Sequence, residues 1–276
     1  MRRAVIDLGT NTFHLLIADV LEDGTLTEIY RERIFVKLAA EGIATIGPTP
    51  FERGVAALKH YRTLLTEYKV ADLTAIGTAA LRTASNGPEF VETALREANI
   101  PIQLISGDEE ARLITTGVLR AIPPPEDNVL IMDIGGGSTE YIIANKAGVH
   151  WRQSFPIGVS VLFNEFHHAD PMTAGEISAL EAHLSQVLKP LVNALAAHPA
   201  NHLVGAAGTF DVLAEALRHP EAPAHPTSHQ LSLTGFPALY QVITSATLAE
   251  RVALPGVPKE RADMIVVAMV LLRHTF

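Results

Sequence analysis

A short acidic turn occurs twice in this chain, about half a molecule apart. An apolar run that ends in Asp7 is followed by Gly9 and hydroxyl side chains, and another that ends in Asp133 is followed by Gly135 in the same way. When Asp7 is aligned with Asp133, the two glycines meet without a gap, and "LLIAD" meets "YIIAN" shortly afterwards. This internal duplication predicts that the chain folds as two units of similar construction.

Each glycine turn lies between segments that are typical of β-strands. The runs "FHLLIADV" and "TEYIIAN" are short, rich in branched or aromatic residues and free of helical spacing. Each run ends at a turn signal, "EDGT" or "NKAG", before a further strand-like run. The glycine turns are therefore predicted to be hairpin loops between antiparallel strands. A P-loop or a Rossmann fingerprint differs, because its glycine turn leads into a helix.

Beyond each group of strands the apolar residues take up helical spacing. A helix is predicted over residues 49–70 after a Thr-Pro start, and strands and helices then alternate; the second half repeats this order more loosely. The run "PPPEDN" at residues 123–128 interrupts the pattern and marks the best domain boundary. We expect an α/β fold of two domains, residues 1–124 and 125–276, each a mixed sheet with flanking helices, with a cleft between the copies.

The composition restricts the function. The chain has 276 residues, of which 48% are hydrophobic, and its formal net charge of −9 argues against a broad surface for nucleic acid or membrane. It has no cysteine, which excludes disulfides, thiolate nucleophiles and cysteine metal sites. The first residues enter a strand-like run rather than a signal peptide, and the longest apolar run, "MIVVAMVLL", is far shorter than the roughly 20 residues of a membrane-spanning helix. We expect a soluble, cytoplasmic protein without a nucleic-acid or membrane partner.

Five motifs taken together resemble one known family. The motifs are "DLGTNTFHLLI", "GTAALRTASN", "ISGDEEARL", "DIGGGSTEY" and "VGAAGT". In this order and spacing they are similar to those of the exopolyphosphatase and guanosine pentaphosphate phosphohydrolase family, in the superfamily of sugar kinases, acetate kinase, heat-shock-type ATPases and actin. The resemblance covers essentially the whole chain and implies two duplicated ribonuclease H-like (actin-like) domains with the active site in the interdomain cleft. Long members carry additional C-terminal helical domains, which this sequence lacks.

The glycine turns suit the binding of phosphate. Glycine can adopt unusual backbone dihedrals, so successive N–H groups can point at phosphate oxygens, and the neighbouring hydroxyl and amide side chains add neutral donors. Two such turns facing each other can bracket one phosphate, which explains the duplication. A third turn, "VGAAGT", adds Gly208 and Thr209, because this place meets the adenosine in nucleotide-using relatives. The predicted phosphate-binding residues of the first two turns are Gly9, Thr10, Asn11, Thr12, Gly135, Gly136, Gly137, Ser138 and Thr139.

Asp7 and Asp133 lie at matching strand ends just before the glycine turns. Hard carboxylate oxygens beside phosphate suit Mg²⁺, which keeps several waters and takes few protein ligands, and Mn²⁺ is an alternative. The resemblance implies a metal-associated aspartate at Asp133. A simpler interpretation is that both aspartates only accept hydrogen bonds from the amides of the turns.

Three further side chains are candidates for catalysis. In "SGDEEARL", Glu109 and Glu110 lie in the first turn of a predicted helix, where negative charge is favourable in itself. The resemblance implies that Glu110 is the general base that activates water. It also implies that Arg82, at the end of "GTAALR", binds phosphate oxygens, with a surface ion pair as the alternative. Glu140 either helps to orient water or metal, or is an outward-facing strand residue.

The predicted function is that of a Mg²⁺-dependent phosphoanhydride hydrolase that releases terminal phosphate from inorganic polyphosphate. Guanosine pentaphosphate is the alternative substrate. It comes second because no appended domain supplies a guanine pocket, whereas Arg82, Lys37 and the "VGAAGT" turn can begin a track for a phosphate chain. The same motifs are compatible with a kinase-like phosphotransferase or a non-catalytic alarmone sensor, but the glutamate pair of "SGDEEAR" favours hydrolysis over transfer. We also expect a homodimer.

Overall fold

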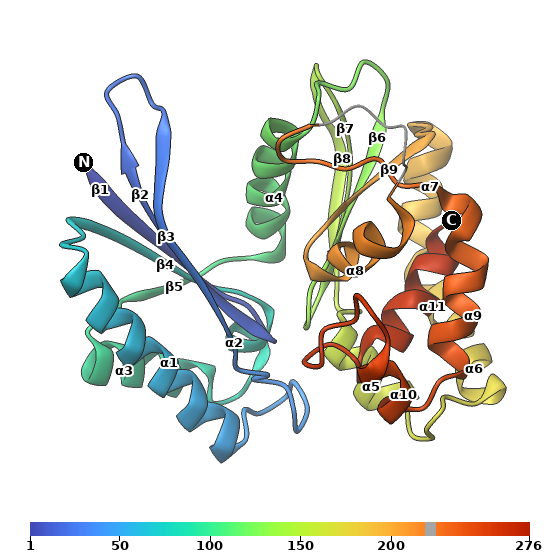
Figure 1. Cartoon of the computed structure of the whole chain (residues 1–276), viewed down its shortest axis with the longest axis horizontal. Helices are drawn as coiled ribbons and strands as arrows, with labels where there is room; N and C mark the ends of the chain where they lie inside the picture. Colours follow the sequence, from blue (N-terminus) through green and yellow to red (C-terminus); the bar gives the residue numbers. More distant parts are fainter. Residues whose placement is uncertain (219–224) are drawn as a thin grey trace. The chain divides into compact units, whose positions relative to one another are not determined.

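Two mixed sheets, one in each part of the chain, correspond to the duplicated sequence pattern. The structure, a computed structural model, describes residues 1–218 and 225–276 and divides into two compact units, Met1–Gly107 and Asp108–Phe276 (Figure 1). The strands of the first unit are β1 (Arg2–Leu8), β2 (Thr12–Val20), β3 (Leu26–Phe35), β4 (Asp72–Gly77) and β5 (Ile102–Leu104). Those of the second unit are β6 (Val129–Ile134), β7 (Thr139–Asn145), β8 (Gly148–Phe155) and β9 (His202–Ala206).

The two sheets share one topology. Their strand orders are β3-β2-β1-β4-β5 and β8-β7-β6-β9. In each, one inner strand, β1 or β6, pairs antiparallel with the next strand and parallel with a strand that follows at least one helix. An irregularity is repeated as well, because the pairing of the second strand with the third shifts at equivalent places, between Ile17 and Ala18 and between Ile143 and Ala144. The predicted duplication is confirmed.

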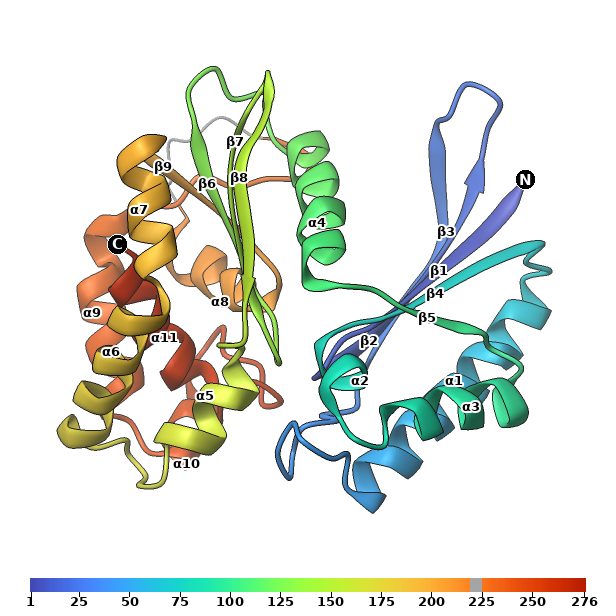
Figure 2. The same ribbon diagram turned by 180° about the vertical axis from the view of Figure 1, so that it is seen from behind.

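Helices cover one face of the first sheet. They are α1 (Pro48–Glu67), α2 (Ala79–Thr83) and α3 (Gly87–Ala98), and Figures 1 and 2 show α1 and α3 on the same side. Strand β1 alternates between buried and exposed residues, so Ile6 and Leu8 enter the core while Asp7 faces out. Ile6 belongs to one apolar cluster with Leu58 and Tyr61 of α1. This is the pattern expected of a sheet with a single covered face.

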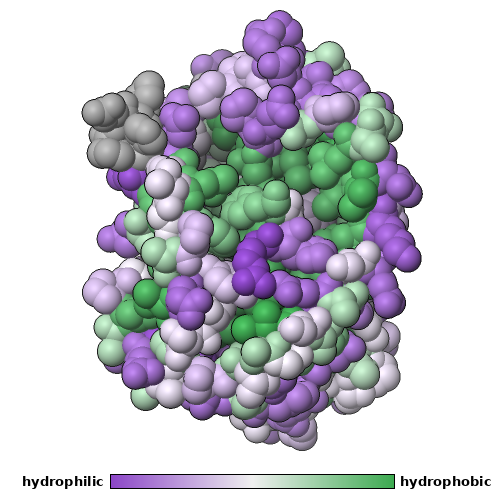
Figure 3. Space-filling model, turned by 90° about the vertical axis from the view of Figure 1, so that its right-hand side faces the viewer, coloured by the Kyte–Doolittle hydropathy of each residue, from purple (hydrophilic) through white to green (hydrophobic). Residues whose placement is uncertain are grey.

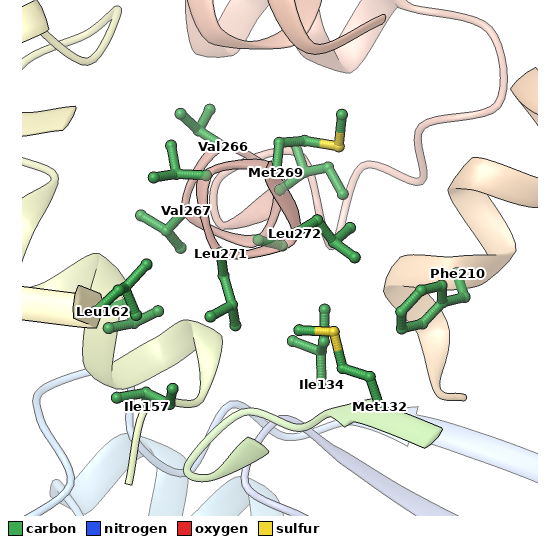
Figure 4. Packing of buried hydrophobic residues seen from close by; sticks show 14 of the residues in the cluster. Met132, Ile134, Ile157, Leu162, Phe210, Val266, Val267, Met269, Leu271 and Leu272 are labelled. Atoms are coloured by element: carbon green, nitrogen blue, oxygen red, sulfur yellow. The ribbon is translucent and has the colours of Figure 1, made fainter. Parts of the chain in front are cut away.

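The second sheet is covered on both faces. Its helices are α4 (Gly107–Ala121), α5 (Val159–Phe166), α6 (Ala174–Val187), α7 (Lys189–Ala197), α8 (Gly208–Leu217), η1 (Leu233–Gly235), α9 (Phe236–Ser245), α10 (Leu248–Ala253) and α11 (Ile265–Thr275). Residues 265–272 of α11 are all buried, and Figure 4 shows apolar side chains leaving this helix on all sides, with Leu271 directed toward the strand of Met132 and Ile134. A helix that is apolar all round is buried in a core. Within the described residues, no helix is both long and apolar enough to cross a membrane.

Helix α4 covers the other face of this sheet. Its buried Ala111 belongs to a small apolar cluster with Ile131 of β6 and Ile142 of β7. Because α4 packs on the second sheet, the compact units divide after Gly107 and not at the boundary expected after residue 124. The proline-rich run at residues 123–128 is instead the loop that leads from α4 to β6.

Apolar side chains also reach the surface of the second unit. Val192 of α7, Val242 of α9 and the last residue, Phe276, are exposed. Figure 3 shows apolar side chains gathered on the face of the molecule that forms the right-hand side of Figure 1. Exposed apolar patches are typical of contact surfaces, and the expected homodimer stays a prediction.

Candidate active site

The first glycine turn links β1 to β2 and is closed by its own backbone. The N–H of Gly9 donates to the carbonyl of Thr12 at 3.1 Å, and a Cβ atom at Gly9 would stand 2.9 Å from that oxygen. The chain after β3 is fastened to the same turn, because the carbonyl of Asn11 accepts from the N–H groups of Val36 and Lys37 at 2.9 and 3.0 Å. Glycine is therefore required at residue 9, and the turn is held from two sides.

Thr10 and Asp7 carry polar groups at this turn. Thr10 is buried, and its hydroxyl has no hydrogen-bond partner among the described residues. A buried hydroxyl without a partner is costly, so it suits a site that a ligand completes. Asp7 is exposed, yet partial loss of the surrounding water raises the pKa of its carboxyl to about 6. A cation beside Asp7 would counteract this shift by favouring the charged form.

The second glycine turn, between β6 and β7, has the same internal bond. The N–H of Gly135 donates to the carbonyl of Ser138 at 3.0 Å, and a Cβ atom at Gly135 would lie 2.9 Å from the accepting oxygen. Helix α5 rests on this turn, because its first two N–H groups donate to the carbonyls of Gly135 and Gly136 at 2.9 and 2.8 Å. Gly158 permits this approach, since a Cβ atom there would meet the backbone of Gly136 at 2.4 Å. Both predicted hairpin turns are present.

The hydroxyl side chains that follow the second turn lie inside the protein. Ser138 and Thr139 are both buried, and the hydroxyl of Thr139 donates to the carbonyl of Ile157 at 3.0 Å. Thr139 therefore helps to fix the segment before α5. The phosphate-binding role predicted for these residues stays a prediction.

Asp133 and Glu140 face each other across the second hairpin. They are directly paired in the register of β6 and β7, so their side chains leave the sheet on the same face. Asp133 is partly exposed, whereas Glu140 is only 1% exposed and its Oε1 accepts a hydrogen bond from the Ser154 hydroxyl at 2.6 Å. Glu140 is therefore a buried residue and not the outward-facing strand residue of the alternative interpretation.

Helix α4 brings further carboxylates to this face. The helix packs on Ile131 of β6 and Ile142 of β7. These residues lie two positions from Asp133 and Glu140 along their strands, and residues two apart on a strand share a face. Figures 1 and 2 show the start of α4 and the turn between β6 and β7 toward the same end of the unit. The first turn of α4 contains Asp108, Glu109 and Glu110. Glu110, expected within residues 1–124, thus belongs to the same unit as Asp133 and Glu140.

Two of the carboxylates in this helical turn have arginine partners. Arg112 donates to both oxygens of Glu109 at 2.7 Å, and Arg152 of β8 donates to both oxygens of Asp108 at 2.7 and 2.8 Å. These hydrogen bonds hold the pKa of Glu109 and that of Asp108 below their ordinary values. Both groups are therefore ionised and engaged at neutral pH.

Arg82 of α2, in the first unit, makes a bond within the fold. Its Nη1 donates to the carbonyl of Ile105 at 2.7 Å, which fastens the segment after β5 to α2. This contact is with the backbone of the same unit. The binding of phosphate by Arg82 stays a prediction.

The third glycine turn holds an arginine that no sequence motif indicates. Gly208 begins α8, directly after Ala207, whose φ of 68° is in the left-handed region. A Cβ atom at Gly208 would lie 1.7 Å from Nη1 of Arg261, so glycine leaves room for this guanidinium against the backbone. Thr209, the next residue of α8, is buried. Arg261 was missed because it is remote from the turn in sequence and outside every quoted motif.

The face of the second sheet that carries Asp133 and Glu140, called the acidic face below, has the donors that magnesium prefers. Asp133 and Glu140 offer hard carboxylate oxygens side by side, and Mg²⁺ is commonly bound by one or two carboxylates together with several waters. Across residues 1–218 and 225–276, no group of three or more His, Asp or Glu side chains is placed to hold a metal ion. The two-carboxylate donor set fits a water-rich magnesium site.

Comparisons with known proteins agree with one another. The model of the Ppx/GppA phosphatase family matches residues 16–276. The structure of an exopolyphosphatase from Cytophaga hutchinsonii is similar, at 38% sequence identity and a TM-score of 0.93, over 100% of this chain and 90% of that chain. A Ppx/GppA family member from Aquifex aeolicus is 27% identical with a TM-score of 0.78, over 100% of this chain and 89% of that chain. These matches confirm the resemblance found in the motifs, and the structure has the two mixed sheets with flanking helices that it implied.

Proposed function

Because this chain belongs to the Ppx/GppA phosphatase family, we propose that it releases the terminal phosphate of inorganic polyphosphate in a Mg²⁺-dependent hydrolysis. The family and its exopolyphosphatase structures make the chain a phosphoanhydride hydrolase. One observation carries the proposal that the hydrolysis depends on Mg²⁺. Asp133 and Glu140 share a face of the second sheet, and α4, whose first turn contains Glu110, packs on that face.

In this reaction the protein contributes mainly positioning and charge, and little covalent chemistry. A phosphoanhydride has a good leaving group, so the enzyme has to position a water in line, neutralise charge and hold the chain. Glu110 takes a proton from the water as the water oxygen bonds to the terminal phosphorus. The bond from that phosphorus to the bridging oxygen breaks, and the bridging oxygen leaves with the shortened chain. The products are orthophosphate and a polyphosphate that is one unit shorter.

Asp133 and Glu140 are the proposed metal ligands of the second unit, and the bond from Ser154 keeps the carboxylate of Glu140 oriented. Asp7, at the equivalent strand end of the first unit, is proposed as a further ligand. Bound Mg²⁺, or Mn²⁺ in its place, supplies positive charge beside the phosphate oxygens. Glu140 can in addition orient the attacking water.

The glycine turns are the proposed phosphate-binding elements. Residues 9–12 and 135–139 form turns with the same internal hydrogen bond, and their remaining backbone N–H groups are the proposed donors to phosphate oxygens. The unpaired hydroxyl of Thr10 adds a donor in the first turn. Arg82 and the turn of Gly208 and Thr209 are proposed to contact phosphates further along the chain.

Polyphosphate is placed before guanosine pentaphosphate as the substrate. The exopolyphosphatase of Cytophaga hutchinsonii is similar over this entire chain, and the elements proposed here recognise phosphate and no base. The net charge of −9 cannot steer a long polyanion toward the enzyme, so binding depends on local donors and metal. Cytoplasmic location and a homodimer stay predictions from the sequence.

The substrate is tested by measuring orthophosphate release with Mg²⁺ from polyphosphate of several lengths, from guanosine pentaphosphate and from ATP, at two salt concentrations. We expect the fastest release from polyphosphate, with an affinity that falls as salt rises, because salt screens the contacts with phosphate. Faster hydrolysis of guanosine pentaphosphate at equal concentration, without dependence on polyphosphate length, would reverse the order. Transfer from ATP to an acceptor would indicate a kinase-like enzyme, and binding without release would indicate a sensor.

A further inference from the structure

A bidentate ion pair joins the start of helix α4 to the edge strand β8. Nε and Nη2 of Arg152 donate to Oδ1 and Oδ2 of Asp108 at 2.7 and 2.8 Å. Two parallel bonds between a guanidinium and a carboxylate fix the orientation of both groups, unlike the single contact of a lysine. Both residues lie in the second unit, although they are 44 residues apart in the chain.

This pair holds the chain at the point where it enters the second unit. Asp108 is the first residue of that unit, and it shares the first turn of α4 with Glu110. Apolar contacts fasten the helix to the sheet from Ala111 onward. The ion pair of Arg152 with Asp108 attaches the helix on the other side of Glu110. Glu110 therefore lies between two residues of α4, Asp108 and Ala111, that are both held to the sheet.

Arg152 also lies beside the acidic face. In the register of β7 and β8, Arg152 is paired with Ile142, and the next pair on this face is Ser154 with Glu140. Side chains of directly paired residues share a face of the sheet. Arg152 therefore connects the helix of Glu110 to the part of the sheet that carries Glu140.

Helix α4 contains a second ion pair of the same kind that does not leave the helix. Arg112 and Glu109 form two bonds of 2.7 Å, and their side chains are 49% and 41% exposed, against 28% and 68% for Arg152 and Asp108. Exposed pairs of this type contribute little to the stability of a fold. The two pairs differ mainly in what they connect, which makes Arg112 a matched control for Arg152.

We propose that Arg152 is a positioning residue for the reaction: by holding Asp108 it orients the first turn of α4, and with it the carboxylate of Glu110, toward the face of Asp133 and Glu140. The inference rests on the proposed role of Glu110 as general base. A small displacement of a catalytic group slows the chemical step far more than it weakens substrate binding. Arg152 therefore acts on turnover and not on affinity or stability.

The test compares Arg152→Gln, Asp108→Asn, their double variant and Arg112→Gln by orthophosphate release from polyphosphate at saturating Mg²⁺. We expect Arg152→Gln to lower kcat about tenfold while KM and Tm stay close to wild type. Arg112→Gln should keep the kcat of the wild type. The double variant should lose no more than either single variant, because one interaction is removed in all three. Arg152→Lys, which keeps the charge but not both bonds, should fall between Arg152→Gln and wild type.

Three results would overturn the proposal. One is a kcat of Arg152→Gln within about twofold of wild type, and another is a rise in KM at unchanged kcat, which would make Arg152 a phosphate ligand. The third is an equal fall of kcat in Arg112→Gln, because loss of any positive charge on the helix would then suffice. These results differ from those expected if the proposed function itself is wrong. In that case the wild type would release no orthophosphate, or Glu110→Gln would keep full activity.

Discussion

Asp133 and Glu140 are directly opposed in the register of β6 and β7, with both side chains on one face of the sheet. Like charges at opposed positions destabilise a sheet, and Glu140 is in addition almost completely removed from solvent. The hydroxyl of Ser154 donates a hydrogen bond to Glu140 at 2.6 Å. A cation bound by the two carboxylates would remove their mutual repulsion, so the arrangement is suited to a positive ligand.

The first prediction concerns the dependence on Mg²⁺. Asp133→Asn and Glu140→Gln should each raise the Mg²⁺ concentration for half-maximal phosphate release, because an amide is a poorer ligand than a carboxylate. Mg²⁺ should also raise the Tm of the wild type by binding the folded state, and raise that of the variants less. Asp127→Asn, in the exposed loop before β6, is the control and should behave as wild type. An unchanged Mg²⁺ requirement in both variants would remove them from the metal site.

The second prediction concerns the general base. Glu110→Gln should lower kcat by roughly 10²–10⁴-fold, the usual contribution of a positioned base, and leave substrate affinity nearly unchanged because the amide keeps the shape. Glu109→Gln is the matched control, since Glu109 is its neighbour in the same turn and is paired with Arg112. The assay is initial orthophosphate release under saturating Mg²⁺. Wild-type turnover in Glu110→Gln would exclude this residue from the mechanism.

The third prediction concerns the phosphate-binding turns. Gly135→Ala places a Cβ atom 2.9 Å from the carbonyl of Ser138, so it should open the turn and weaken substrate binding, and valine at Gly135 or Gly136 should abolish binding in a protein that still folds. The measurement is KM for polyphosphate together with Tm. Gly117→Ala in α4, where a Cβ atom meets nothing within 4 Å, is the control. It should leave KM unchanged and raise the free energy of unfolding by about 0.5–1 kcal/mol. An unchanged KM in the Gly135 and Gly136 variants would contradict the role of the turn.

The fourth prediction concerns the pH dependence of stability. Glu176 closes a capping box at the start of α6, where hydrogen bonds from the N–H and the hydroxyl of Thr173, at 2.7 and 2.8 Å, lower the pKa of its carboxyl from 4.5 to about 2. Because the folded value is lower than the unfolded one, the contribution to stability is complete above about pH 4.5 and is lost as the pH falls toward 2. Tm of the wild type should exceed that of Glu176→Gln at neutral pH and converge with it in acid. A difference that stays constant with pH would show that Glu176 does not titrate in this way.

Local signals in the sequence were sufficient for the two hairpins. Gly9 and Gly135 lie in short turns between strand-like runs, and the structure gives both turns the same backbone bond. The mixed sheets with flanking helices followed from the change of period along the chain. These features depend on residues that are near one another in sequence, which explains why pattern and turn chemistry identify them.

Long-range packing accounts for what the sequence did not indicate. A proline run suggests a boundary near residue 124, but the apolar face of α4 around Ala111 packs on β6 and β7, and this moves Glu110 into the second unit. The contacts of Arg152 with Asp108 and of Arg261 with the backbone at Gly208 also join distant segments. No local pattern distinguishes these arginines from surface charges, so only the folded chain identifies their partners.

The central claim is that water cleaves the terminal phosphoanhydride. Its most direct test is to run the reaction with polyphosphate and Mg²⁺ in water enriched in ¹⁸O and to analyse the products of the first turnover by mass spectrometry. We predict that each orthophosphate released carries one oxygen from the solvent, that the shortened chain carries none, and that Glu110→Gln slows the appearance of the label. Label in the shortened chain instead of orthophosphate, or release that requires an added acceptor, would contradict the account.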